Sequence, residues 1–340
     1  MVTELLHPPL ETKSSNADQH LADRGVADLG KFKYSVVVPV FNGADKIEEL
    51  FGRIAATFEA RQCRYEIVIV NDGSTDNTWD VIKTAAAKNP NIVAIDLTRN
   101  FGQHPAVLCG LAHSSGDFML TIDADLQNPP EELFKLIEPA VEKRLELIFA
   151  KFTKKQHALY RNIGSKIISR LNEIIFDKPE NLNISNVRIM SKDLVAKMTA
   201  HKTAFPYING LALVCSDPAK RANVIVEHHK RIGSVSTYTP VRIAKLVCTI
   251  IFNYSKLPAL IKNVGYGTAW FSVVLGIAFI AKHYFLSTLL PEFTPVIAVM
   301  AFCNALLALL LGVLAQYAEK MMETLSMNSS YAIGSIIKGE

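Results

Sequence analysis

The chain has 340 residues, a formal net charge of +4 and five scattered cysteines. Its length allows one to three domains, and the charge is too small to indicate a nucleic acid partner, so none is expected. The cysteines show neither a CxxC pair nor zinc-ligand spacing, which is typical of reduced thiols in a cytosol-like compartment. Mean hydropathy is +0.19, high for a soluble enzyme, and the apolar excess follows Val241.

The first thirty residues are polar, without an apolar core behind a basic start. We therefore predict a mobile tail over 1–30 rather than a signal peptide. After it, strands and helices are expected to alternate. The predicted strands are 34–40, 65–70, 91–97, 118–122 and 147–150, and the predicted helices are 44–60, 75–88, 104–113 and 130–143. This alternation favours an α/β fold with a mostly parallel, doubly wound sheet.

Carboxylates stand where two of these strands end. Asp123 and Asp125 follow the buried run 118–122, and Asp72 follows 65–70. In an open α/β sheet, ligands bind at the carboxyl ends of strands, and two aspartates one residue apart can share a hard cation with phosphate oxygens. Asp72 suits the N–H groups of a base or a ribose hydroxyl. The alternative is that these aspartates only stabilise their own turns.

Two common nucleotide motifs are absent. The turn after the first strand has only Gly43 where a dinucleotide fingerprint needs three glycines. The sequence also contains no GxxxxGK[ST] phosphate loop. Dehydrogenase and NTPase functions are therefore disfavoured. Ser74 or Thr75 is expected to cap the helix at 75–88.

From Lys151 the pattern changes. We predict helices at 154–175, 191–199 and 205–215 and strands at 183–190 and 222–229. His228 and His229 are adjacent on a predicted strand and point to opposite faces, so they make a poor metal pair. Lys230 and Arg231 either meet phosphate or form a solvated charge run.

A helix over 239–263 carries one narrow polar stripe, which is typical of a helix lying in a membrane surface; its members are Arg242, Lys245, Thr249, Asn253 and Lys256. Two apolar runs follow, Val264–Ala281 and Pro295–Ala315, each long enough to span a bilayer. Basic residues flank the pair, whereas the connector has almost none, so both termini and the catalytic domain are expected in the cytoplasm, at the inner (plasma) membrane. Residues 318–340 are predicted to be a cytoplasmic tail.

Several short motifs together resemble one family. They are Val38–Asn42, Val70–Asp76, Arg99–Gly102 and Ile122–Glu131, followed by the paired apolar runs ending in Leu314–Tyr317. The chain resembles the polyprenyl-phosphate glycosyltransferases of glycosyltransferase family 2, which include bacterial undecaprenyl-phosphate sugar transferases and dolichyl-phosphate mannose synthases. The resemblance runs from about Tyr34 to the C-terminus. It implies a GT-A catalytic domain over 31–238, followed by the surface helix and two transmembrane helices over 264–317.

The resemblance also implies roles for individual residues. The nucleotide-binding residues are Pro39, Val40, Asn42, Asp72, Asp123 and Ala124. Asp123 and Asp125 would hold Mg²⁺ or Mn²⁺, and the catalytic residues are Asp123, Asp125, Gln127 and Arg188. The acceptor phosphate would meet Arg188, Arg231, Ser236 and Tyr238. The chain departs from the family pattern at Asn186, where many bacterial members carry an aspartate proposed as a base.

The expected activity is inverting transfer of one sugar from a nucleotide sugar, with UDP as the nucleotide, to polyprenyl phosphate at the cytoplasmic membrane face. Expected partners are the donor, the lipid acceptor, the bilayer and further copies of the chain. The acceptor phosphate is mostly dianionic at neutral pH, so it needs positioning more than deprotonation. Alternatives are a mannose synthase that uses GDP-mannose and a non-catalytic membrane scaffold. Tyr207, Asn209 and the loop 151–157 are candidates for sugar selection.

Overall fold

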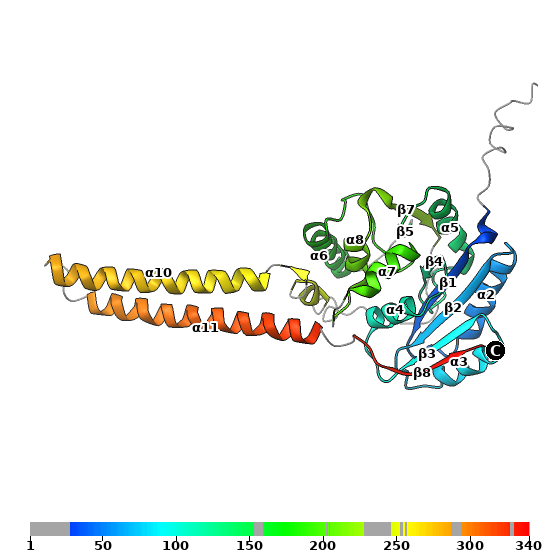
Figure 1. The fold of residues 1–340 in the computed structure, drawn as a ribbon, viewed down its shortest axis with the longest axis horizontal. Coiled ribbons are helices and arrows are strands. Elements are labelled where there is room, and N and C mark those ends of the chain that lie inside the picture. Colours follow the sequence, from blue (N-terminus) through cyan, green and yellow to red (C-terminus); the bar gives the residue numbers. More distant parts are fainter. Residues whose placement is uncertain are drawn as a thin grey trace, which may run out of the picture.

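The computed structural model describes residues 28–152, 159–201, 203, 205–227, 246–251, 254–255, 257–286, 294–326 and 330–339. These residues form an α/β domain and a long helical hairpin that projects from it (Figure 1). The domain begins with a short 3₁₀ turn, η1 (Leu29–Lys31), inside the predicted tail. The remainder of the tail, 1–27, lies outside the described residues.

One eight-stranded sheet organises the domain, in the order β7-β5-β6-β4-β1-β2-β3-β8. The strands are β1 (Lys33–Val40), β2 (Arg64–Asn71), β3 (Ile92–Leu97), β4 (Phe118–Thr121), β5 (Leu147–Phe152), β6 (Arg188–Ser191), β7 (Arg221–Val226) and β8 (Ile333–Lys338). The four central strands β4, β1, β2 and β3 run parallel. Strand β6 runs antiparallel between β4 and β5, and β8 runs antiparallel beside β3. A mostly parallel α/β sheet was the expectation, and it is confirmed.

Helices cover both faces of the sheet because the central strands are apolar on both sides. In β1, Val36 and Val38 face one core cluster while Val37 faces the other. The first cluster is closed by α2 (Ile47–Glu59), α3 (Thr78–Ala86) and α5 (Leu133–Glu142). The second is closed by α4 (Gln103–Ala112), α7 (Lys192–Ala200) and α8 (Ile208–Cys215). Helix α6 (Leu159–Phe176) and the turns η2 (Pro130–Glu132) and η3 (Pro218–Lys220) complete the domain.

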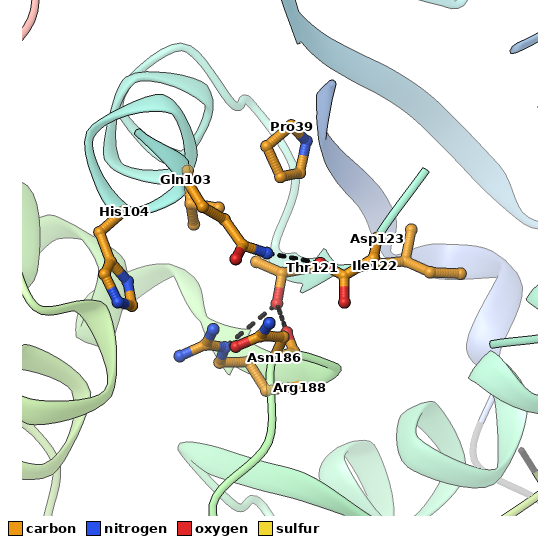
Figure 2. A pocket seen from close by; sticks show the side chains of 9 residues that line it. Pro39, Gln103, His104, Thr121, Ile122, Asp123, Asn186 and Arg188 are labelled. Carbon is orange, nitrogen blue, oxygen red and sulfur yellow. Dashed lines mark hydrogen bonds between the residues drawn. The ribbon is translucent and has the colours of Figure 1, made fainter. Parts of the chain in front are cut away.

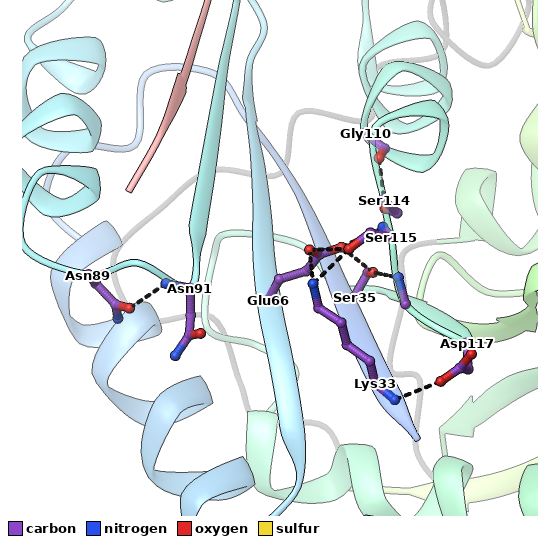
Figure 3. A network of polar contacts seen from close by, with 10 residues as sticks. Lys33, Ser35, Glu66, Asn89, Asn91, Gly110, Ser114, Ser115 and Asp117 are labelled. Carbon is purple, nitrogen blue, oxygen red and sulfur yellow. Dashed lines mark hydrogen bonds and ion pairs between the residues drawn. The ribbon is translucent and has the colours of Figure 1, made fainter. Parts of the chain in front are cut away.

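A buried ionic network joins the amino ends of the central strands (Figure 3). The carboxylate of Glu66 accepts from Lys33 Nζ at 2.7 Å, Ser35 Oγ at 2.6 Å and the Ser115 amide at 2.6 Å. Burial alone would raise the pKa of Glu66, but these hydrogen bonds outweigh it and leave the pKa below its usual value. The network therefore fastens β1, β2 and the turn before β4 at the end opposite to Asp72 and Asp123.

The hairpin consists of α10 (Leu257–Leu286) and α11 (Thr294–Ser326). The helices approach closely where a Cβ on Gly265 would lie 3.0 Å from the backbone of Gly312. Within the described residues one segment is long and apolar enough to cross a membrane, Val296–Glu319, with a mean hydropathy of 2.6 and most of its side chains exposed. The second predicted span, in α10, does not reach that standard.

Two other expectations need correction. Most of the described part of the predicted tail 318–340 is helix or strand: α11 continues to Ser326, and β8 extends the sheet beyond β3. Ser74 and Thr75 do not cap α3, which begins at Thr78 with Asn77 as its N-cap, because Ser74 Oγ donates to Asn71 instead.

The predicted membrane-surface helix is only partly described. Residues 246–251 are helical, and Ile250 is fully buried in the domain core, so this part packs against the domain. Four members of its polar stripe, Arg242, Lys245, Asn253 and Lys256, lie outside the described residues.

Candidate active site

A small pocket opens at the carboxyl ends of β1 and β4 (Figure 2). Its lining residues come from β1, α4, β4 with the loop after it, and the approach to β6: Pro39, Gln103, His104, Val107, Thr121, Ile122, Asp123, Asn186 and Arg188. Strand β4 ends at Thr121, and the chain then turns through Asp123 and Asp125. This is the place where an open α/β sheet binds ligands.

Asp123 is the acidic group of the pocket. Gln103 Nε2, at the start of α4, donates to Asp123 Oδ1 at 2.5 Å, as Figure 2 shows. Burial and the neighbouring charge of Asp125 raise the pKa of Asp123 to about 6, although Asn186, Arg188 and Gln103 oppose the shift. Two carboxylates that repel each other at a strand end favour a bound cation.

Arg188 is the basic group of the pocket and is only 2% exposed. Its Nε donates to Thr121 Oγ1 at 3.1 Å and to the Asn186 carbonyl at 3.3 Å, and its Nη1 donates to Asn209 Oδ1 at 2.5 Å. Burial lowers the pKa of Arg188 to about 10, while Asp123 and Tyr207 act in the opposite direction. These three hydrogen bonds all go to neutral oxygens, so much of the electrostatic attraction of Arg188 is available to an anion in the pocket.

His104 forms a second wall of the pocket. Its ring meets that of Tyr207 edge to face, with centroids 5.3 Å apart. Burial, together with the charge of Arg188, lowers the pKa of His104 to about 4. A neutral imidazole is therefore present at physiological pH, with one nitrogen as donor and one as acceptor.

The loops around the pocket are joined by side-chain hydrogen bonds. The carboxylate of Asp72 accepts from the amides of Phe101 and Gly102 at 2.7 and 2.9 Å. Asn42 has a positive φ of 51° and accepts from the amide of Thr75 at 2.9 Å. Gly73 has φ +63°, and a Cβ there would lie 2.3 Å from the backbone of Arg99. The loops after β1, β2 and β3 therefore form one rigid rim.

The structure brings together part of the predicted site. Pro39, Asp123 and Arg188 line the pocket, whereas Asn42 and Asp72 lie in the rim. Val40 and Ala124 pack against the domain core. The amide of Gln127 donates to Asp125 Oδ1 at 3.1 Å, which fixes the turn after Asp123. The predicted acceptor residues Arg231, Ser236 and Tyr238 lie outside the described residues.

Sequence reasoning missed Gln103, His104 and Thr121. Gln103 and His104 could have been identified as site residues because they are the polar pair that begins α4, a helix that is buried from Ala106 to Leu111. Polar side chains on the first turn of a buried helix are expected to serve a site.

Few side chains in the described part of the site could act as metal ligands. Among the described residues no cluster of three or more His, Cys, Asp or Glu side chains is positioned to hold an ion. Asp123 and Asp125 still offer hard oxygen donors in one turn after β4, the donor type that fits a divalent cation. Such an ion would take its remaining ligands from a bound molecule or water.

Comparisons with known proteins agree with this fold. The sequence profile described as glycosyl transferase family 2 matches residues 35–202. The chain is 32% identical over 249 residues to an undecaprenyl-phosphate 4-deoxy-4-formamido-L-arabinose transferase from Pseudomonas syringae pv. syringae (strain B728a), covering 73% of this chain and 72% of that protein.

Solved structures are similar in fold. Glucosyl-3-phosphoglycerate synthase from Mycobacterium tuberculosis in complex with Mn²⁺, UDP and phosphoglyceric acid superposes with a TM-score of 0.50 at 16% identity, over 67% of this chain and 78% of that one. The same enzyme with Mn²⁺, UDP and glucosyl-3-phosphoglycerate gives a TM-score of 0.51 at 17% identity, over 67% and 80%.

Proposed function

The chain belongs to glycosyl transferase family 2, and from this membership we propose that it transfers one sugar from a nucleotide sugar to polyprenyl phosphate. The observation that carries the proposal is the pocket in which Asp123 and Arg188 meet at the carboxyl end of the sheet, in a domain attached to an apolar hairpin. The similarity to an undecaprenyl-phosphate sugar transferase supports a lipid phosphate as acceptor.

In this proposal the donor lies over the carboxyl ends of β1 and β2. Its nucleoside would rest against the rim that Asp72 and Asn42 hold together, and its diphosphate would reach Asp123 and Asp125. Those two carboxylates would hold Mg²⁺ or Mn²⁺, which supplies positive charge for the departing nucleoside diphosphate. Gln103 keeps the Asp123 carboxylate in one orientation through its 2.5 Å hydrogen bond.

The acceptor needs a cation more than a base. A phosphate monoester with a second pKa near 6 is mostly dianionic at neutral pH, so it attacks without a protein base. Asn186 in the place of a family aspartate is compatible with this chemistry. Arg188, together with Arg231, would orient the acceptor phosphate, and attack opposite the leaving group inverts the anomeric carbon.

The location follows from the hairpin. We propose that α10 and α11 both span the inner membrane, with the catalytic domain and both termini in the cytoplasm and with homo-oligomers formed through the spans. Large apolar side chains are exposed along both helices, including Trp270 at 72% and Leu314 at 65%. A surface of this kind is stable in lipid and costly in water.

The test is a donor screen. Purified protein in detergent is incubated with undecaprenyl phosphate, Mg²⁺ or Mn²⁺ and a panel of UDP-, GDP- and dTDP-sugars, and lipid-linked product is measured by mass spectrometry. We expect one UDP-sugar to react, and Asp125→Ala to abolish the product while the protein stays folded. Metal-dependent nucleotide binding without product from any donor would contradict the proposed acceptor. No nucleotide binding at all would favour a scaffold.

A further inference from the structure

Helix α6 carries apolar side chains on its outer side as well as on its inner side, where Leu171 and Ile175 pack against the core. In the part with described side chains, 167–176, the exposed positions are Ile167, Arg170 and Ile174, which repeat at three and four residues and so form one outward stripe. Ile167 is 46% exposed and Ile174 is 68% exposed. The polar Asn172 is instead buried, with its Nδ2 donating to Tyr207 Oη at 3.0 Å. A helix facing water would be expected to carry the isoleucines inward.

This stripe, called here the α6 face, lies close to the root of the hairpin. Along the long axis of the molecule, α6 is at the end of the domain from which α10 and α11 leave (Figure 1). Phe176, the last residue of α6, meets the ring of Tyr254 at 5.3 Å. The hydroxyl of Tyr254 donates to the carbonyl of Phe205 at 2.9 Å, and Phe205 is itself 40% exposed. Helix α10 begins at Leu257, three residues after Tyr254.

The hairpin indicates where the surface of the bilayer would lie relative to the contact between Phe176 and Tyr254. The candidate span ends at Glu319, which pairs with Lys262 at 2.6 Å, and one turn inside the span Tyr266 donates to Gln316. Lys262 lies only five residues into α10, or roughly 8 Å along the axis. The headgroup layer on each side of a bilayer is roughly 5–8 Å thick. If α11 spans, the headgroup layer extends about as far as the start of α10, and Tyr254 with the end of α6 lies next to its outer edge.

We propose that the α6 face is a membrane-contact surface of the catalytic domain, and that Ile167 and Ile174 insert among the lipid headgroups around the hairpin. This inference rests on the proposed function for the membrane location of the hairpin and goes beyond it, because it assigns a lipid contact to the domain itself. Arg170, 67% exposed at its side chain, stands between the isoleucines. Its Nη1 pairs with Glu173 Oε2 at 3.0 Å, and in this proposal the outer edge of the guanidinium faces lipid phosphates.

The contact reaches the pocket through a short chain of side chains. Asn172 on the inner side of α6 binds Tyr207, and the ring of Tyr207 packs against His104 in the pocket wall. Seating α6 on the membrane therefore holds this side of the pocket at the surface from which a lipid phosphate arrives. The α6 face is expected to affect use of the lipid acceptor and not of the soluble donor.

The first experiment measures depth directly. A nitroxide label is placed by Ile174→Cys, Ile225→Cys or Leu310→Cys in a protein that carries Cys215→Ser, Cys248→Ser and Cys303→Ser, which removes the exposed and half-buried thiols. The protein is reconstituted in nanodiscs of phosphatidylethanolamine with a minor fraction of phosphatidylglycerol. Collision rates with oxygen and with a water-soluble nickel chelate are then compared. Ile225 is the matched control, 59% exposed on the edge strand β7. Leu310, 53% exposed on α11, reports insertion of the hairpin.

We expect the label at 310 to meet oxygen and to avoid nickel, the label at 225 to meet nickel freely, and the label at 174 to lie between them. A label at 174 that behaves like the one at 225 overturns the inference while leaving the proposed function intact. Protection of position 174 from both reagents also overturns it, because a second copy of the chain would then cover the face. Nickel access at 310 would refute hairpin insertion, and with it the membrane part of the proposed function.

A kinetic experiment tests the consequence. In the same nanodiscs, Ile174→Glu should raise the apparent KM for polyprenyl phosphate by roughly tenfold, the order expected from losing one apolar side-chain contact. The KM for the donor and the thermal midpoint should not change, and Ile225→Glu should leave both KM values unchanged. Equal changes in both KM values, or a lowered thermal midpoint, would mean that Ile174 acts on the fold and would contradict a membrane contact.

Discussion

Replacing Arg188 with methionine should strongly reduce sugar transfer and leave the free energy of unfolding almost unchanged. Arg188 is 2% exposed, and burial lowers its pKa from 12.5 to about 10. A downward shift of this size means that keeping the side chain charged costs the folded state about 3 kcal/mol at neutral pH. Methionine has a similar length and carries no charge, so the substitution relieves that cost.

An opposing contribution comes from the acceptors that Arg188 leaves behind. Asn209 Oδ1 loses its donor at 2.5 Å, and an unpaired buried acceptor costs about 1–3 kcal/mol. Thr121 is less affected, because its hydroxyl still donates to the Asn186 carbonyl. The two contributions nearly cancel. Transfer should fall about 100-fold or more, the usual effect of removing a group that stabilises developing charge.

The two quantities are measured separately. Urea unfolding is followed by the fluorescence of Trp79 in a protein with Trp270→Phe, so that the signal reports on the domain, and transfer is followed by lipid-linked product. Arg221→Met is the matched control: Arg221 is half-buried and its pKa is also lowered, but it binds Ser216 and lies outside the pocket. It should retain transfer. If Arg188→Met loses 3 kcal/mol or more of stability, or retains transfer, the assignment of Arg188 to the site is wrong.

Three further predictions concern the rim, the pocket wall and the last strand. Gly73→Ala should lose nucleotide binding in calorimetry and about 1–2 kcal/mol of stability, because Gly73 has a φ of +63° and an added Cβ would meet the backbone of Arg99. Gly52→Ala should change neither quantity, because nothing lies near a Cβ added there. Burial lowers the pKa of His104 from 6.5 to about 4, so the free energy of unfolding is unaffected by this group above pH 6.5 and falls by up to about 3 kcal/mol as the pH drops to 4. His104→Gln should flatten that part of the dependence of urea unfolding on pH. An unchanged dependence would contradict a buried neutral imidazole. Tyr331→Ala should expose Cys109, now fully buried and hydrogen bonded to Tyr331, to maleimide in peptide mass spectrometry; continued protection would mean that Tyr331 does not cover it.

The central fold could be predicted because the apolar pattern of each strand matches its position in the sheet. Runs such as Val36–Val38 are apolar on both faces, and in the sheet both faces are covered. Asp72 and Asp123 stand directly after such runs, so parallel strands bring them to one edge. The expected role of Asp72 stays a prediction: its carboxylate accepts from the amides of Phe101 and Gly102 in the loop after β3, rather than from its own turn as the alternative supposed.

The parts that could not be predicted depend on contacts distant in sequence. Strand β8 is six residues long, contains Gly334 and pairs with β3 across more than two hundred residues, so its own pattern does not distinguish it from a tail. The environment of Arg188 could not be predicted either. Its partners Thr121 and Asn209 come from other elements, and their spacing in the chain does not indicate that they meet Arg188. Residues 183–187 were expected in a strand, but β6 begins only at Arg188.

The last strand also determines how the hairpin is held. Before the hairpin, Tyr254 binds the carbonyl of Phe205 and the amide of Tyr207. After it, the amide of Thr98 donates to the carbonyl of Ala332 at 3.0 Å, and β8 pairs with β3. Two attachments on different parts of the domain restrict its rotation about the hairpin, which one linker could not do. Because the second attachment includes the loop that Asp72 binds, the same strand that orients the domain also holds the rim in place.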